Sequence, residues 1–84
     1  MNTTTIISLI QAGATDKVRK DLKRESLKDR LKSLQKCIPH VNQTPEILNF
    51  FHKNFATEIG AIISANHDLE KAEHLYREAV NYDK

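Results

Sequence analysis

The chain has 84 residues, of which 39% are hydrophobic, and carries 13 lysines and arginines against 11 aspartates and glutamates. A chain this short seldom divides into two cores, so we expect one small soluble domain over residues 1–84 and exclude a multidomain architecture. No run approaches the roughly eighteen consecutive apolar residues that cross a membrane, and the shortage of glycine and proline favours an all-α fold.

The expected compartment follows from the cysteine content and the start of the chain. Cys37 is the single cysteine, so no disulfide can form within the chain. The opening residues lack the basic segment, long apolar run and small-residue cleavage site that mark a secretory signal. The sequence therefore predicts a cytoplasmic protein.

The first predicted element is a short helix over residues 3–12. Its large apolar residues lie too close together for a clean amphipathic stripe, and its β-branched start leaves a strand as the alternative. Gly13 is expected to end this helix, after which Thr15 or Asp16 is expected to cap the next one.

A basic helix is predicted over residues 16–38, where apolar residues follow the helical period except for a step of five between Leu22 and Leu27. Ser26 stands at this step with Asp29 three residues later, which is a variant of the capping box. Two alternatives remain, an unbroken helix and a break near residues 25–26. We expect Pro39 to end the segment by pushing Ile38 out of the helical region.

Two further helices are predicted over residues 45–65 and 69–82. Thr44 before Pro45 is a strong start signal, because it supplies a capping hydroxyl and a proline whose missing N–H is harmless in the first turn. Apolar residues then keep helical spacing to about Ala65. Asn66 and His67 are expected to form a turn, and Asp68 is expected to cap the last helix.

The short connection between these helices predicts a C-terminal antiparallel αα-hairpin within a small helical bundle. Gly60, Ala65 and Ala72 are small, and we expect them to let the two helix axes approach closely.

The segment over residues 55–84 resembles a single tetratricopeptide repeat. Ile59-Gly60 stands at the Leu-Gly pair of that pattern, Ile63 at the next large position, Ala72 at the small position and Tyr76 four residues later. The pattern departs at Ala56 and Lys84, which replace an aromatic residue and the closing proline, and no second copy lies upstream. The resemblance implies a scaffold that binds other proteins and has no enzyme activity.

Charge divides the chain into two halves. Between Asp16 and Lys36, nine basic residues oppose four acidic ones, whereas from Pro45 onward seven acidic residues oppose four basic ones. We expect the basic segment to contact a partner, and the candidate residues are Lys17, Arg19, Lys20, Lys23 and Arg24. Alternating acids, and the lack of an interleaved aromatic residue, favour a protein partner over nucleic acid.

Phe50 is a further candidate for partner binding. It lies about 100° around the helix from Phe51, and partial exposure there would let it anchor a contact. A place in the core together with Phe51 and Phe55 is nevertheless favoured for Phe50.

Catalytic and metal chemistry find little support in the sequence. His67 and His74 share a helical face but have no further ligands of zinc-site spacing around them. Cys37, with His40 three residues on, has the character of a small core residue rather than of an activated thiolate. We therefore expect no enzyme activity, no metal, no cofactor and no small-molecule substrate.

The function predicted from the sequence is a small cytoplasmic protein-interaction module that serves as an adaptor, chaperone or inhibitor. Its partner is another protein or a second copy of the chain, because basic and acidic surfaces can pair across a homodimer. The alternative is a small helical nucleic-acid-binding regulator that uses the basic segment over residues 16–36.

Overall fold

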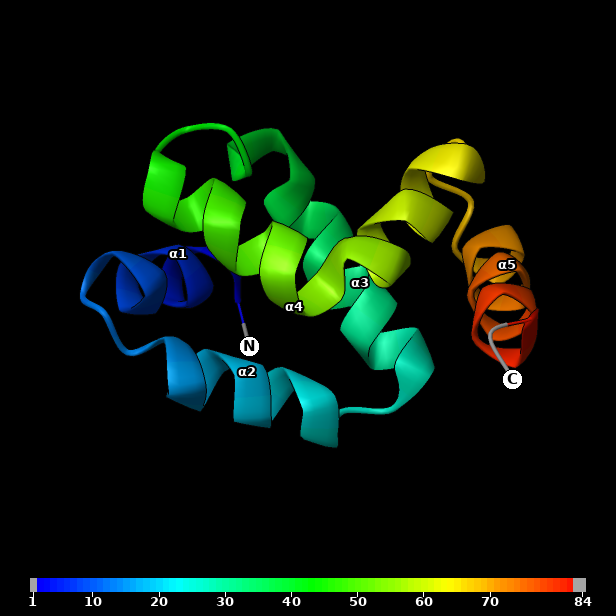
Figure 1. Cartoon of the computed structure of the whole chain (residues 1–84), viewed down its shortest axis with the longest axis horizontal. Coiled ribbons are helices and arrows are strands. Elements are labelled where there is room, and N and C mark those ends of the chain that lie inside the picture. Colours follow the sequence, from blue (N-terminus) through cyan, green and yellow to red (C-terminus); the bar gives the residue numbers. More distant parts are fainter. Residues whose placement is uncertain (1, 83–84) are drawn as a thin grey trace.

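The computed structural model describes residues 2–82, and within that range the chain is helical and has no strand, which confirms the predicted all-α fold (Figure 1). The helices are α1 (Thr3–Gln11), α2 (Thr15–Arg24), α3 (Leu27–Cys37), the short 3-10 helix η1 (Ile38–His40), α4 (Pro45–Ser64) and α5 (Leu69–Tyr82). No helix in this range is long and apolar enough to span a bilayer. Lys84, which replaces the closing proline of the repeat pattern, lies outside the described residues.

The first segment is a helix because local hydrogen bonds satisfy both of its ends. At the start, Asn2 Oδ1 accepts a hydrogen bond from the Thr5 N–H at 2.8 Å. At the end, Gly13 has a φ of 85°, which lets the Ala14 N–H reach the Leu9 carbonyl at 2.9 Å. This geometry is the helix C-cap predicted for Gly13.

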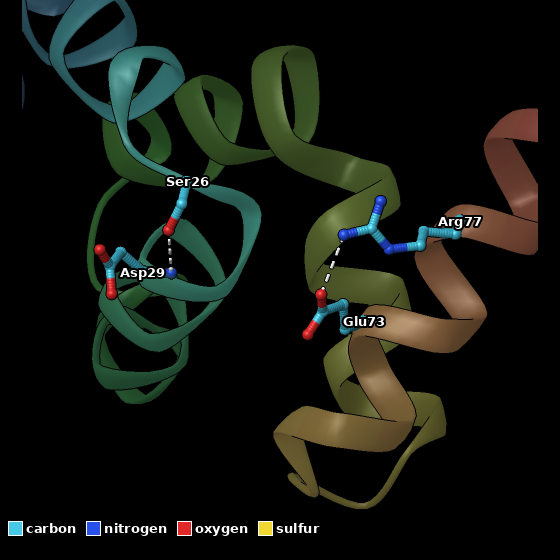
Figure 2. Close-up of polar contacts among 4 residues, drawn as sticks. All are labelled: Ser26, Asp29, Glu73 and Arg77. Carbon is cyan, nitrogen blue, oxygen red and sulfur yellow. Dashed lines mark hydrogen bonds and ion pairs between the residues drawn. The ribbon is translucent and has the colours of Figure 1, made fainter.

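The segment predicted as a basic helix over residues 16–38 is broken into α2 and α3. Glu25 is extended, with φ −68° and ψ 153°, and separates the two helices. Ser26 Oγ accepts a hydrogen bond from the Asp29 N–H at 3.2 Å and thereby caps the start of α3 (Figure 2). Of the two alternatives, the structure has the break.

Two predictions at helix ends are wrong. Thr15 and Asp16 lie inside α2, whose N-cap is Ala14 and has no side-chain hydrogen bond. Ile38 keeps helical angles of φ −53° and ψ −43°, because Pro39 lies in the first turn of η1. A proline is tolerated there, since the first N–H groups of a helix have no partner within it.

Helix α4 begins as expected and bends in its middle. Thr44 Oγ1 accepts a hydrogen bond from the Ile47 N–H at 3.3 Å. Phe55, with φ −137° and ψ 27°, leaves the helical conformation. Beside it, the Asn54 side-chain amide donates to the Phe50 carbonyl at 3.0 Å. This side chain shares an acceptor of the helical ladder next to the bend, which the sequence did not predict.

The core lies between α4 and the helices around it. Helix α4 crosses the molecule, with α1 and α3 along it and α5 against its second half (Figure 1). Most of the large, fully buried side chains come from the first four α-helices, whereas α5 buries Ala72 completely. Those side chains are Ile6, Val18, Leu22, Leu31, Leu34, Ile47, Phe51, Phe55 and Ile62.

The turn between α4 and α5 is held by polar contacts. Asn66 and His67 both have left-handed angles, with φ 54° and 66°. Gln35 on α3 donates its side-chain amide to the His67 carbonyl at 2.7 Å. Asp68 Oδ1 accepts the Glu70 N–H at 3.1 Å and caps α5, as predicted. The chain therefore reverses and α5 runs back along α4.

Gly60 does not create the close approach of α4 and α5, which corrects our expectation. It is exposed, and a Cβ added there would meet no atom within 4 Å. The buried small residues at this contact are Ala61, Ala65 and Ala72. Gly60 instead lies on the wall of an open groove between the two helices, lined by Thr57, Gly60, Ala61, Ser64, Leu75 and Ala79.

The two glycines provide a matched test of backbone effects. Neither has an atom near the position of an added Cβ, but only Gly13 has a positive φ, of 85°. We expect Gly13→Ala to lower the free energy of unfolding by about 1 kcal/mol. Gly60→Ala should raise it by about 0.5–1 kcal/mol, because alanine is the better helix former. Urea denaturation measures both changes in the free energy of unfolding. If the two substitutions changed it in the same direction, this account would be contradicted.

Candidate functional site

The candidate basic residues lie on one exposed side of α2. Lys17, Lys20, Lys23 and Arg24 are exposed and Arg19 is half-buried, opposite the fully buried Val18 and Leu22. Arg19 contacts Asp16 at 3.1 Å, and Lys17 contacts Asp21 at 3.5 Å. The remaining three cations make no ion pair within residues 2–82. Lys20, Lys23 and Arg24 therefore form a group of unneutralised charges, which we call the basic face.

Phe50 lies in the core, as the sequence favoured, and its candidacy as an exposed contact residue is wrong. Its side chain is 5% exposed, and its ring meets Phe51 edge to face at a centroid distance of 5.2 Å. The ring also lies 5.8 Å from that of Phe55. The helical-wheel argument failed because α4 is covered by α1, α3 and α5, so more than one side of it is buried.

A cleft of about 420 Å³ opens at the end of the basic face, where four helices meet. Lys23 comes from α2, Arg30 from α3, and Tyr76 and Val80 from α5. Helix α4 contributes Asn54, Thr57 and Glu58, on both sides of its bend. Of all the candidate residues in α2, Lys23 alone reaches this cleft; Arg19 lines a smaller hollow of about 230 Å³ beside it.

Arg30 and Glu58 form a largely buried ion pair in this cleft. Arg30 Nε lies 3.3 Å from Glu58 Oε2, and the two side chains are 14% and 9% exposed. The geometry is that of an ion pair without a hydrogen bond, because Arg30 Nε is buried and has no hydrogen-bond partner. The guanidinium carbon also lies 5.7 Å from the centre of the Tyr76 ring. Arg30 is thus held by a carboxylate and by an aromatic face.

Cys37 is unsuited to nucleophilic chemistry. Its side chain is 0% exposed, at the end of α3. Burial raises the pKa of the Cys37 thiol to about 11, which leaves the thiol protonated at neutral pH. His40, considered with it, is hydrogen-bonded to Gln43 at 2.8 Å.

The histidines proposed as weak metal candidates are not brought together with further ligands. Within residues 2–82, no three side chains of His, Cys, Asp or Glu are grouped as a metal site requires. His74 Nε2 instead contacts Glu78 Oε1 at 2.8 Å along α5.

The acidic charge on α5 is partly neutralised within that helix. Arg77 donates to Glu73 at 2.9 Å, four residues apart on the surface (Figure 2). Glu78 is engaged by His74 when the imidazole is protonated. Two of the acidic side chains of α5, Glu73 and Glu78, therefore have a contact within the helix.

Sequence analysis did not single out Arg30, Glu58 or Tyr76 as site residues. One signal was available: Glu58 stands on the apolar stripe of α4, three residues after Phe55 and four before Ile62. A carboxylate at such a position is rarely buried unless a cation pairs with it.

Comparisons with protein-family models, with curated proteins and with solved structures find no match for this chain. The site is therefore interpreted from its own geometry, and the tetratricopeptide-like hairpin stays a prediction.

Proposed function

We propose that this chain is a non-catalytic protein-interaction module that binds an acidic segment of a partner protein through the basic face of α2. The observation that carries the proposal is the group of three exposed cations without ion pairs inside the described part of the chain. Unneutralised charges attract a complementary surface and speed its association. An adaptor, chaperone or inhibitor that works in the cytoplasm fits this chemistry. The free, buried thiol of Cys37 is consistent with such a reducing compartment.

The basic face favours protein over nucleic acid as its partner. Asp16 and Asp21 lie on the same helix, where Arg19 and Lys17 engage them, and they do not distinguish the two kinds of partner. The helix spans only ten residues and has no aromatic side chain to stack on bases. Nucleic acid is therefore the competing outcome of the test below.

The test compares two probes of similar charge. A short fluorescent peptide rich in glutamate and leucine and a short DNA duplex are titrated with the protein, and anisotropy is measured at low and moderate salt. We expect saturable binding of the peptide. The double variant Lys20→Glu/Arg24→Glu should weaken this binding by roughly tenfold or more, as reversal of interface charges does.

A matched variant separates the basic face from total charge. Lys36→Glu/Lys71→Glu makes the same charge change at exposed positions on α3 and α5, and should weaken binding of the peptide by no more than roughly twofold. Tighter binding of DNA than of peptide, with a steep loss as salt rises, would favour the nucleic-acid regulator. Equal losses for both double variants would remove the basic face as the binding surface.

The prediction that the partner is a second copy of the chain is tested by a separate measurement. In such a homodimer, the basic face of one copy would meet α5 of the other, and the reciprocal contact would close the pair. Solution mass measured over a range of protein and salt concentrations distinguishes this dimer from a monomer that binds a different protein.

A further inference from the structure

Arg30 has hydrogen-bond donors that its contact with Glu58 does not use. Glu58 approaches its Nε atom at 3.3 Å, and the Tyr76 ring lies against its guanidinium group. No acceptor within residues 2–82 bonds its two Nη groups. Nε is the one side-chain atom of Arg30 that is buried without a hydrogen bond, so the Nη groups keep access to the surface of the cleft. Two parallel N–H donors held in this way match the two oxygens of one oxyanion.

The other walls of the cleft suit an oxyanion carried on a short apolar stem. Lys23 adds a second positive charge at the exposed end of α2. Asn54 and Thr57 supply an amide and a hydroxyl for hydrogen bonds. Tyr76 and Val80 present apolar surface, and Val80 is 40% exposed. A volume of about 420 Å³ is ample for one amino-acid side chain.

We propose that this cleft receives one carboxylate of a glutamate side chain in the acidic segment that the basic face binds, an inference that rests on the proposed function. The carboxylate lies between the Nη groups of Arg30 and the ammonium of Lys23. The methylene groups of the glutamate contact Tyr76 and Val80. The cleft thus fixes the position of a segment that the basic face attracts without specificity.

The charge of the cleft favours a carboxylate over a phosphate. Lys23 and Arg30 contribute two positive charges and Glu58 removes one, so the net charge is close to that which a monoanion neutralises. A phosphate near its dianionic form would leave the filled cleft with a net negative charge, whereas one carboxylate leaves it close to neutral. Inorganic phosphate is therefore the proper competitor in the test.

The direct test observes the Arg30 side chain while small probes are titrated. The probes are N-acetyl-glutamate amide, which carries one carboxylate, and inorganic phosphate. We expect saturable NMR shifts of the Arg30 Nε–Hε signal and of the Tyr76 ring signals with the glutamate derivative, at lower concentration than with phosphate. Shifts spread over all arginine signals, or a stronger response to phosphate, would overturn the proposal.

Substitutions test the same site with the acidic peptide. Arg30→Lys keeps the charge but loses the paired donors, and should weaken binding of the peptide roughly fivefold. Glu58→Gln removes the negative charge beside the ligand and should strengthen binding roughly threefold to fivefold. The control Arg77→Lys makes the same substitution at an exposed position on α5, outside the basic face and outside this cleft, and should leave affinity within roughly twofold. Circular dichroism verifies that each variant is folded.

The outcomes separate the two proposals. If Arg30→Lys and Glu58→Gln leave peptide affinity unchanged while Lys20→Glu/Arg24→Glu abolishes it, the carboxylate site is wrong and the interaction module stands. If the peptide does not bind but the glutamate derivative shifts the Arg30 and Tyr76 signals, the site stands and the proposed partner is wrong. The double variant Arg30→Met/Glu58→Leu, which keeps the volume of the pair, should lose the Tyr76 shifts with the glutamate derivative and should bind the peptide at least roughly fivefold more weakly.

Discussion

Arg30→Ala is expected to lower the free energy of unfolding by about 3–5 kcal/mol, because it leaves a buried carboxylate without its opposite charge. Glu58 is 9% exposed, and the ion pair with Arg30 joins α3 to α4. The change also removes the contact of the guanidinium with the Tyr76 ring on α5. Urea denaturation followed by circular dichroism measures the loss as a lower midpoint.

Two variants control for this result. Arg24→Ala removes an arginine that is exposed on α2 and should change stability by no more than about 0.5 kcal/mol. Arg30→Met/Glu58→Leu replaces both charges with apolar groups and should recover wild-type stability or exceed it. If Arg30→Ala and Arg24→Ala had the same free energy of unfolding, the ion pair would be solvated by water and would not contribute to stability.

Phe51→Ala is expected to lower the free energy of unfolding by about 3–5 kcal/mol, because it opens a cavity in the centre of the core. Phe51 is 0% exposed, and its ring contacts Phe50 edge to face at 5.2 Å. Small domains are stable by only about 5–15 kcal/mol, so this variant should be partly unfolded at moderate temperature. Thermal and urea denaturation report the loss.

The comparison variant for Phe51 lies on the same helix. Ile63 is 57% exposed, and Ile63→Ala should change stability by no more than about 0.5 kcal/mol. A loss at Ile63 as large as that at Phe51 would show that the outer side of α4 is covered in solution, as an interface between copies would cover it.

Helix ends were the most predictable part of the fold, because their chemistry is local. Thr44, Ser26 and Asp68 each accept a backbone hydrogen bond within three residues, so neighbouring residues suffice to place them. The start of α2 shows where this reasoning fails. Thr15 and Asp16 have the right side chains, but the N-cap is Ala14, one or two residues earlier, whose N–H also takes part in ending α1.

Burial around α4 was harder to predict, because it depends on contacts between distant segments. Phe50 is covered only because α4 has neighbours on several sides. The pairing of Arg30 with Glu58 joins residues 28 positions apart, and no local spacing signals it. The bend at Phe55, with the side-chain hydrogen bond of Asn54 beside it, is likewise not revealed by the helical period.

The bend in α4 also determines what the cleft does when a ligand occupies it. Asn54 precedes the bend at Phe55, whereas Thr57 and Glu58 follow it, and all three face the same hollow. A ligand that contacts both sides of the bend links the two halves of α4 to each other. Because such a ligand binds the folded state and not the unfolded one, its binding raises the free energy of unfolding. The ligand-bound domain is therefore more stable than the free domain.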